Sequence, residues 1–113
     1  MMEVKISMGD FVDRHTILDI KNDNELDVSV ELDFYDNNWL HRDKYYMYYF
    51  TILKAINSQL WCLEDRKRKD VERYTEEESD VAFIITSLND LRHETKKRID
   101  QFYKSEMTEK KSH

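Results

Sequence analysis

The most regular feature of the sequence is a long stretch in which apolar side chains recur at steps of three and four residues. It runs from about Leu40 to Arg73, and this spacing places the apolar side chains along one side of an α-helix. At 1.5 Å per residue, a helix of this length spans roughly 50 Å. Its apolar seam consists of Tyr45, Tyr49, Ile52, Ile56, Leu60 and Leu63.

A second long helix is predicted to begin near Glu76. Thr75 and Glu78 form a capping box, in which the threonine hydroxyl accepts a hydrogen bond from the first turn and the glutamate reaches back to the cap. Two long helices joined by a tight break should lie antiparallel as a hairpin. The apolar seam of the second helix consists of Val81, Ile84, Ile85, Leu88, Leu91, Ile99 and Phe102.

The N-terminal segment predicts a shorter helix that begins after Ser7. Ser7 and Asp10 form a similar capping box, and apolar residues follow it at helical spacing. The polar cluster 22–24 should end this helix after Lys21. Residues 2–6 are expected to form a short extended lead-in to the helix.

Residues 25–38 fit two patterns. Every second residue from Val28 to Phe34 is apolar, as in a half-buried strand, but apolar residues also recur here at helical steps of four. We favour a helix, because a strand here could pair only with residues 2–6, and a two-stranded ribbon is marginal unless it is packed. That ribbon is the alternative.

The composition supports a helical fold. The 113-residue chain has no proline and one glycine, Gly9, whereas sheet-rich folds need such residues at hairpins and tight turns. The length allows one domain with one core. We therefore expect an all-α protein in which one or two shorter N-terminal helices pack across the antiparallel hairpin. Residues 1–106 should form the domain and residues 107–113 a frayed tail.

Acidic residues concentrate in the first part of the chain. Residues 1–40 carry ten acids and three bases, while residues 41–113 carry fourteen acids and fifteen bases. An acidic face disfavours nonspecific binding to nucleic acid, so no direct nucleic-acid partner is expected. The stretch 19–36, with seven acids and one lysine, leaves open an alternative in which the protein mimics nucleic-acid phosphate on a basic protein site.

The cysteine content and the start of the chain predict a cytoplasmic protein. Cys62 is the one cysteine and cannot form an internal disulfide, and residues 1–5 lack the apolar core of a secretory signal. We expect Cys62 to be a buried structural thiol. The longest aromatic and aliphatic run, from Tyr45 to Leu53, is less than half of the roughly 20 residues that cross a bilayer, so no membrane span is predicted.

Motifs that carry catalysis or bind metals are scarce. One glycine cannot supply a phosphate-binding loop, a nucleophile elbow or a dinucleotide fingerprint. Asp90 and His93 share a helix face like half of a bundle metal site, but the sequence offers no second half. The basic run 66–69 has acids one helical turn before it, which is typical of a solvated surface. We therefore expect no metal, no cofactor and a binding role rather than catalysis.

The aromatic stretch 45–50 is larger than one helical seam can hold. Consecutive aromatic residues wrap the helix, so another part of the chain or a partner must cover some of them. Within the chain, Phe34, Tyr35 and Trp39 are candidates. Tyrosine and tryptophan are also enriched at protein interfaces, so a second copy or another protein partner is an equally favoured source of cover. The candidate interface residues are Tyr45, Tyr46, Tyr48, Tyr49 and Phe50.

Three motifs carry a resemblance to a known family. They are Ser-x-Gly-Asp-x-x-Asp-Arg-x-Thr-Ile-Leu-x-Ile-Lys at 7–21, Leu-Trp-x-x-Glu-Asp at 60–65 and Asn-Asp-x-Arg at 89–92. In these motifs the chain resembles an uncharacterised family of bacterial and phage domains of unknown function. The resemblance implies an all-helical fold and brings no assigned activity. The chain departs from the family at His15 and in its tyrosine-rich block.

The motif residues are polar or amphipathic and come from three predicted helices. If they converge, they form either a buried network that fixes the register of the helices or a pocket for a ligand or partner. We favour the buried network, because one arginine between carboxylates is a common way to satisfy buried charge. The candidate residues are Asp13, Arg14, Thr16, Trp61, Glu64, Asp65, Asn89, Asp90 and Arg92.

These features support two hypotheses about function. The leading hypothesis is a non-enzymatic helical interaction module, a homodimer, that binds a host or phage macromolecule as an accessory or regulatory factor. The alternative is a small helical enzyme or ligand-binding protein for a phosphorylated or sugar-nucleotide ligand. That alternative would use the cluster Asp13, Glu64, Asp65, Asn89, Asp90 and Arg92.

Overall fold

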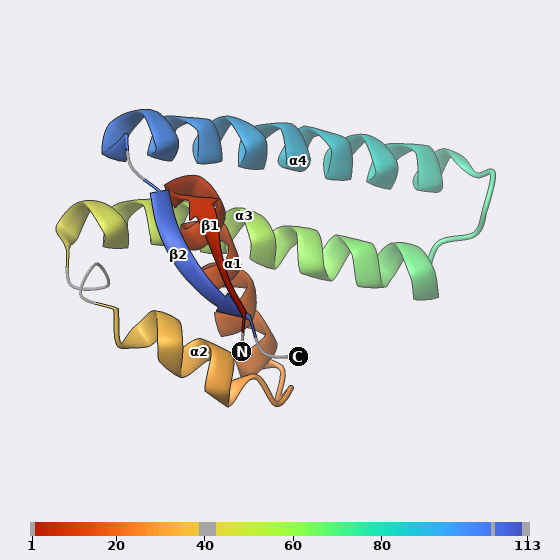
Figure 1. The fold of residues 1–113 in the computed structure, drawn as a ribbon. Helices are drawn as coiled ribbons and strands as arrows, with labels where there is room; N and C mark the ends of the chain where they lie inside the picture. Colours follow the sequence, from red (N-terminus) through yellow and green to blue (C-terminus); the bar gives the residue numbers. More distant parts are fainter. Residues whose placement is uncertain (1, 39–42, 105, 112–113) are drawn as a thin grey trace.

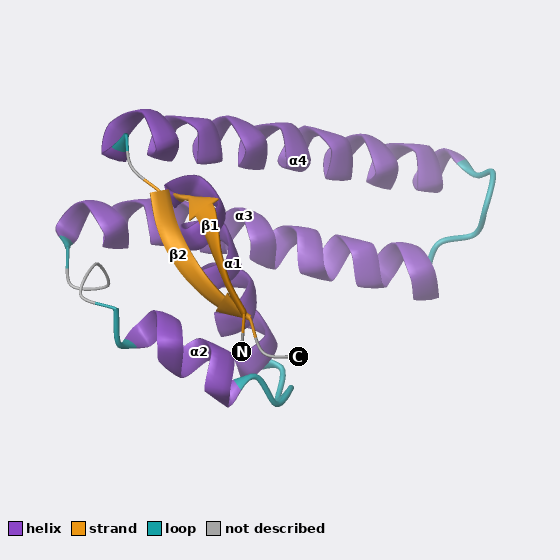
Figure 2. Ribbon diagram, viewed as in Figure 1, coloured by secondary structure: helices purple, strands orange, loops and turns teal. Residues whose placement is uncertain are grey.

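The computed structural model contains four helices and one two-stranded ribbon among its described residues (Figures 1 and 2). It describes the backbone of residues 2–38, 43–104 and 106–111, and the side chains of residues 5–38 and 43–104. The predicted all-α class is confirmed, with the ribbon as an addition. The elements are β1 (Met2–Ser7), α1 (Met8–Asp23), α2 (Ser29–Asp36), α3 (Lys44–Lys69), α4 (Glu76–Tyr103) and β2 (Glu106–Lys111).

Helices α3 and α4 lie side by side and form the predicted hairpin (Figure 1). Helix α3 begins at Lys44 because the Asp43 carboxylate accepts a hydrogen bond from the Tyr45 amide at 3.0 Å and so caps the first turn. It ends at Lys69. Its 26 residues correspond to about 39 Å, so the helix is about one turn shorter than predicted at each end.

Helix α4 begins at Glu76, where the sequence predicts it. The Thr75 hydroxyl accepts a hydrogen bond from the Glu78 amide at 3.2 Å. The Glu78 carboxylate in turn accepts one from the Tyr74 amide, also at 3.2 Å, one residue before the partner expected for a capping box. This cap satisfies amides that have no carbonyl partner in the first helical turn.

Helix α1 begins after the predicted Ser7 cap, whose hydroxyl accepts a hydrogen bond from the Asp10 amide at 3.1 Å. The Asp10 carboxylate forms an ion pair with Lys96 of α4 at 2.7 Å. The hydrogen bond from Lys96 lowers the pKa of Asp10 below its usual value. The start of α1 is therefore tied to α4.

Helix α1 ends at Asp23, slightly beyond the predicted Lys21. The chain turns at Glu25, which has a left-handed φ of 63°, a conformation that glycine takes more readily. The amides of Glu25 and Leu26 donate to the carbonyls of Asn22 and Lys21, both at 3.0 Å. These bonds satisfy carbonyl groups at the end of the helix and explain where it stops.

Residues 25–38, which fit both a helix and a strand, contain α2. The preference for a helix is confirmed. Its buried residues are Leu32 and Tyr35, and Tyr35 packs on Phe11 of α1 with ring centroids 4.6 Å apart. Packing against α1 therefore selects the helical pattern over the alternating one.

The expected frayed tail over 107–113 is replaced by a strand for most of its length. Residues Glu106–Lys111 form β2, which runs antiparallel to β1 in a register that pairs Met2 with Lys111. The extended lead-in has backbone donors and acceptors that need partners, and the helical α2 cannot supply them. A left-handed φ of 54° at Lys104 ends α4 and turns the chain. The ribbon thus joins the two ends of the described chain.

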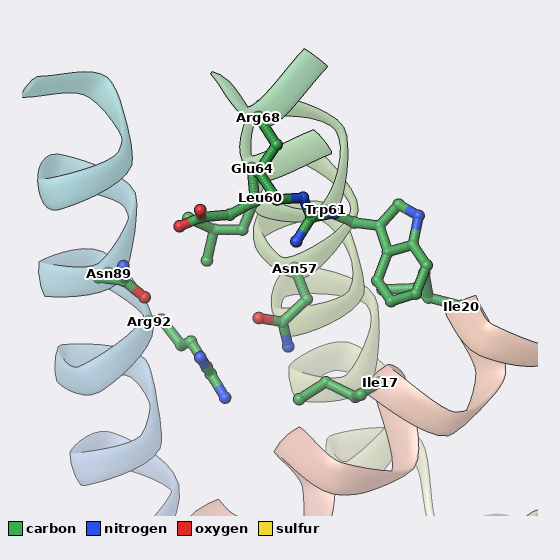
Figure 3. Close-up of a pocket in the computed structure, with 9 residues that line it drawn as sticks. All are labelled: Ile17, Ile20, Asn57, Leu60, Trp61, Glu64, Arg68, Asn89 and Arg92. Atoms are coloured by element: carbon green, nitrogen blue, oxygen red, sulfur yellow. The ribbon is translucent and has the colours of Figure 1, made fainter. Parts of the chain in front are cut away.

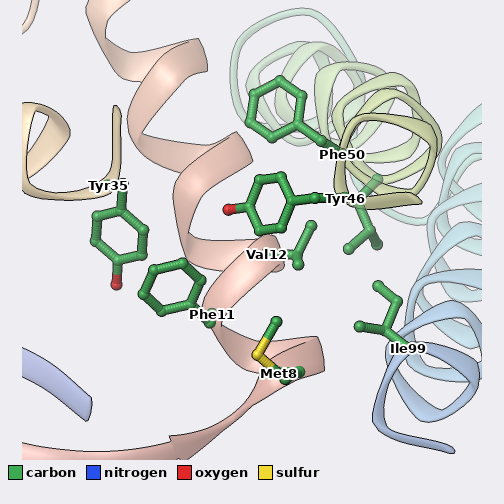
Figure 4. Close-up of a cluster of buried hydrophobic side chains, with 8 residues drawn as sticks. Met8, Phe11, Val12, Tyr35, Tyr46, Phe50 and Ile99 are labelled. Carbon is green, nitrogen blue, oxygen red and sulfur yellow. The ribbon is translucent and has the colours of Figure 1, made fainter. Parts of the chain in front are cut away.

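The core is divided into two clusters. The larger cluster lies where α1 crosses the hairpin, near the start of α3 and the end of α4 (Figure 4). The members of the smaller cluster come from α3 and α4 alone. The larger cluster contains Met8, Phe11, Val12, Tyr35, Tyr46, Phe50, Leu53 and Ile99, and the smaller one contains Ile56, Leu60, Val81 and Ile85.

The aromatic stretch 45–50 is split between the core and the surface. Tyr46 and Phe50 are buried in the larger cluster, so they do not belong to an exposed interface as predicted. They are covered because α1 and Tyr35 of α2 pack over this part of the hairpin. Trp39, another predicted cover, lies outside the described residues. The candidate interface side chains that remain at least partly exposed are Tyr45, Tyr48 and Tyr49.

Cys62 is exposed, so the expectation of a buried thiol is wrong. It lies on α3 between the seam residues Leu60 and Leu63. Successive residues of a helix point about 100° apart, so a residue between two seam positions points away from the seam.

His15 links three helices at the larger cluster. Its Nδ1 lies 2.7 Å from the Tyr46 hydroxyl, and its Nε2 lies 2.8 Å from the Asp36 carboxylate. A carboxylate only accepts hydrogen bonds, so Nε2 of His15 donates to Asp36, and Nδ1 shares a second hydrogen bond with the Tyr46 hydroxyl. Burial raises the pKa of Tyr46 well above its usual value, so this hydroxyl keeps its proton.

Replacing Tyr46 with phenylalanine should lower the free energy of unfolding by about 1–2 kcal/mol, because the buried hydrogen bond between the Tyr46 hydroxyl and Nδ1 of His15 is lost. Urea unfolding followed by circular dichroism measures the change. Tyr48→Phe, at an exposed ring, is the control and should change stability by less than about 0.5 kcal/mol. Equal losses in the two variants would contradict a specific contribution from the Tyr46 hydroxyl.

Candidate functional site

Four polar side chains from three helices meet between α1, α3 and α4. Asp13 and Thr16 come from α1, Asn57 from α3 and Arg92 from α4. The side chain of Arg92 is 25% exposed, whereas Asp13, Thr16 and Asn57 are buried. We call these four residues the polar node. It reaches water mainly through Arg92.

The hydrogen bonds of the polar node connect all three helices. Nε and Nη2 of Arg92 donate to the two carboxylate oxygens of Asp13, at 2.9 and 2.6 Å. The Asn57 amide donates to Oδ1 of Asp13 and to the hydroxyl of Thr16, both at 2.9 Å. The Thr16 hydroxyl donates to the backbone carbonyl of Asp13 at 2.7 Å. Helices α3 and α4 are therefore both held to α1 at this point.

Charge in the polar node is balanced by the pair between Arg92 and Asp13. The hydrogen bonds to Asp13 raise the pKa of Arg92 further above its usual value, so the guanidinium remains charged. Removing one partner of a buried ion pair leaves an uncompensated charge and typically costs about 3–5 kcal/mol. The polar node thus fixes the relative placement of three helices, which is the buried network that the sequence favours.

A cavity of about 330 Å³ opens beside the polar node. Asn57 and Arg92 point toward it from α3 and α4, and Trp61 lies beside Ile20 of α1 (Figure 3). Cavities of this size and mixed character are suited to small molecules. The lining residues are Ile17, Ile20, Asn57, Leu60, Trp61, Glu64, Arg68, Asn89 and Arg92.

The structure brings most of the candidate binding residues to this place. Asp13, Thr16 and Arg92 belong to the polar node. Arg92 also lines the cavity, together with Trp61, Glu64 and Asn89. A buried network and an open cavity therefore lie side by side and share Arg92 and Asn57.

Arg14, Asp65 and Asp90 lie outside the cavity. Asp65 and Asp90 each follow a cavity residue by one position, which turns them about 100° around the helix. Asp65 forms an ion pair with Lys69 at 3.0 Å. Arg14 lines a separate groove beside Phe34 of α2.

Asn57 and Arg68 belong to the site although the sequence patterns did not identify them as candidates. Asn57 occupies a core position between Leu53 and Leu60 of α3, and a polar residue inside an apolar seam indicates a buried hydrogen-bonding partner. That signal is present in the sequence. Arg68 belongs to a basic run that predicts a solvated surface, and its side chain is exposed, yet it also lines the cavity.

Among the described residues, no three His, Cys, Asp or Glu side chains are placed to hold a metal ion. None of the described helices is long and apolar enough to cross a membrane.

Similarity to known proteins does not identify the function. Comparison of the chain with models of protein families, with curated proteins and with solved structures found no match. The resemblance of the three sequence motifs to an uncharacterised family stays a prediction. Function is therefore inferred from the residues of this chain.

A second candidate site is the side of the hairpin turned away from α1. Helix α1 contacts the hairpin through residues such as Asn57 and Lys96. On the opposite flank of α3, the residues Tyr45, Ile52 and Leu63 are separated by seven and by eleven positions. These separations are close to two and three helical turns, so the three side chains form one line along the helix. The matching line on α4, with the same spacing, consists of Ile84, Leu91 and Phe102. We call these two lines the outer face.

The two lines of the outer face meet at one end of the hairpin, near the start of α3 and the end of α4. The rings of Tyr45 and Phe102 have centroids 5.0 Å apart, and Tyr49 packs on the same Phe102 ring at 5.8 Å. About half of the surface of Tyr45, Ile84, Leu91 and Phe102 remains exposed. Ile52 and Leu63 are partly buried against the smaller core cluster. The exposed apolar part of the outer face therefore consists mainly of Tyr45 on α3 and of Ile84, Leu91 and Phe102 on α4.

Proposed function

We propose that the protein is a non-enzymatic helical interaction module and that it associates with a second copy of itself through the outer face. The observation that carries this proposal is the pair of apolar lines along α3 and α4. Single exposed apolar residues are ordinary on protein surfaces, but contiguous apolar surface is typical of interaction sites. Aromatic residues are also enriched where protein surfaces meet.

The charge pattern of α3 supports the same surface. Between Tyr45 and Leu63, Lys54 is the one charged residue, in a chain with 37% charged residues. Lys54 belongs to the α1 side of the helix, where it pairs with Asp19 at 2.7 Å and Asp23 at 3.1 Å. The outward side of α3 is therefore uncharged over this length, whereas the outer side of a solvated helix is normally charged or polar.

A second copy suits this surface because of its symmetry. A two-fold dimer places the same patch of both subunits in contact, and the uncharged side of α3 brings no like charges together. The apolar lines have the same spacing on two antiparallel helices, so a two-fold rotation can place each line against its counterpart as in a four-helix bundle. The smaller core cluster, built from α3 and α4 alone, would gain two more helices.

Replacing Leu91 with lysine should weaken self-association at least about 10-fold, because each dimer would bury two unpaired ammonium groups. His93→Lys is the matched control, since His93 is exposed on α4 away from the outer face and also gains a charge. Light scattering after size exclusion, over a series of concentrations, measures the association, and circular dichroism verifies folding. Equal association of the two variants would contradict the proposed surface.

A further inference from the structure

The polar node presents fixed hydrogen-bonding groups to the cavity. Asn57 gives its amide hydrogens to Asp13 and Thr16, so its Oδ1 is held in one orientation, and Figure 3 shows it directed toward α4. Nε and Nη2 of Arg92 donate hydrogen bonds to Asp13. The Nη1 side of the guanidinium is therefore the part that can donate to a ligand. Groups that are already oriented lose little entropy when a ligand binds.

The rest of the lining supplies a flat apolar wall and a carboxylate. Trp61 is 37% exposed, and its indole lies beside Ile20. Aromatic faces of this kind stack on planar rings such as nucleobases. Glu64 and Asn89 line the cavity from α3 and α4. The cavity therefore combines a surface for stacking with donors and acceptors at its edges.

The charges around the cavity cancel one another. Arg68 and Arg92 are cations that line the cavity. The anions are Glu64, which also lines the cavity, and Asp13, which pairs with Arg92. A phosphate or another strongly anionic group would meet repulsion as well as attraction here. A neutral planar molecule that both donates and accepts hydrogen bonds matches this balance better.

We propose that the cavity binds guanine, as the base or the nucleoside. Guanine has two neighbouring N–H donors, which one carboxylate such as that of Glu64 can accept together, and its O6 and N7 match the donors of an arginine. Trp61 supplies the surface on which its rings stack. This proposal goes beyond self-association, because the cavity lies on the α1 side of the hairpin and the outer face on the other side.

Fluorescence of Trp61 reports directly on this cavity. The chain has two tryptophans, so Trp39→Phe leaves Trp61 as the one indole. Guanosine should quench its fluorescence in a saturable way, whereas uridine, which carries the same ribose on a single ring, should not. Absence of saturable quenching by guanosine up to about 1 mM, a limit that corresponds to roughly 4 kcal/mol of binding free energy, overturns the proposal. Equal quenching by uridine also overturns it.

Glu64→Gln and Asp90→Asn form a matched pair for the same titration. Both remove a carboxylate, but Glu64 lines the cavity, whereas Asp90 is exposed and lies outside it. Glu64→Gln should weaken guanosine binding at least about 10-fold, and Asp90→Asn should leave it within about twofold. Equal affinities of the two variants would overturn the assignment. The Leu91→Lys variant can be titrated identically, so failure of guanosine binding is distinguishable from failure of self-association.

Discussion

Gly9→Ala should lower the free energy of unfolding by about 3 kcal/mol, because overpacking against a rigid neighbour costs about 1–3 kcal/mol and sometimes more. Gly9 lies where the start of α1 passes close to the backbone of α4. A Cβ at this position would overlap the carbonyl oxygen of Lys96 and come within 2.9 Å of the Asp100 carboxylate. The Gly9 amide also donates a hydrogen bond to that carboxylate at 2.6 Å. The added methyl group would therefore force the two helices apart.

The sign of this effect separates close packing from helix propensity. Propensity alone predicts that alanine stabilises a helix interior by about 0.5–1 kcal/mol relative to glycine. Chemical unfolding of Gly9→Ala measures the difference. Asp100→Ala is the companion variant, which removes the acceptor without adding a Cβ and should cost about 1–2 kcal/mol. A Gly9→Ala protein at least as stable as the unmodified chain would contradict the close contact.

Arg92→Met should lower the free energy of unfolding by about 3 kcal/mol, since the buried Asp13 carboxylate would keep only neutral partners. Methionine retains an unbranched apolar side chain, so the loss reports mainly on the guanidinium. Arg98→Met is the control, because Arg98 pairs with Glu94 at 3.5 Å on the exposed side of α4. Exposed pairs of this kind contribute about 0.3–0.5 kcal/mol.

A double-mutant cycle tests whether the ion pair acts as a unit. Asp13→Leu combined with Arg92→Met leaves no unpaired charge in the polar node, so the double variant should lose less stability than the two single variants added together. The difference should be at least about 2 kcal/mol. Urea unfolding of the four proteins provides the comparison. Additive losses would show that the two side chains contribute independently.

The hairpin and the helix starts could be predicted because their signals are local. Long stretches with apolar residues at steps of three and four specify amphipathic helices. Ser7 and Thr75 accept the cap hydrogen bonds at the positions that the sequence predicts. The β1–β2 ribbon could not be predicted in the same way. Its strands come from opposite ends of the described chain, and strand pairing depends on tertiary context more than on local propensity.

The direction in which each side chain points around its helix explains most of the differences between the predicted and the observed site. Glu64 and Asp65 are adjacent acids in one motif, but only Glu64 lines the cavity. Tyr45 and Tyr46 are adjacent rings, yet one is exposed and the other lies in the core. A turn of about 100° separates neighbours on a helix, and the sequence does not state on which side of the hairpin α1 packs. Asn57 is different, since its polar side chain in an apolar seam was a usable signal.

Sedimentation equilibrium of the unmodified chain tests self-association most directly, because it measures mass in solution without reference to shape. The outer face predicts a species of twice the 13.9 kDa chain mass that dissociates on dilution. A mass of 13.9 kDa at every concentration, up to the highest at which the protein remains dissolved, would contradict it.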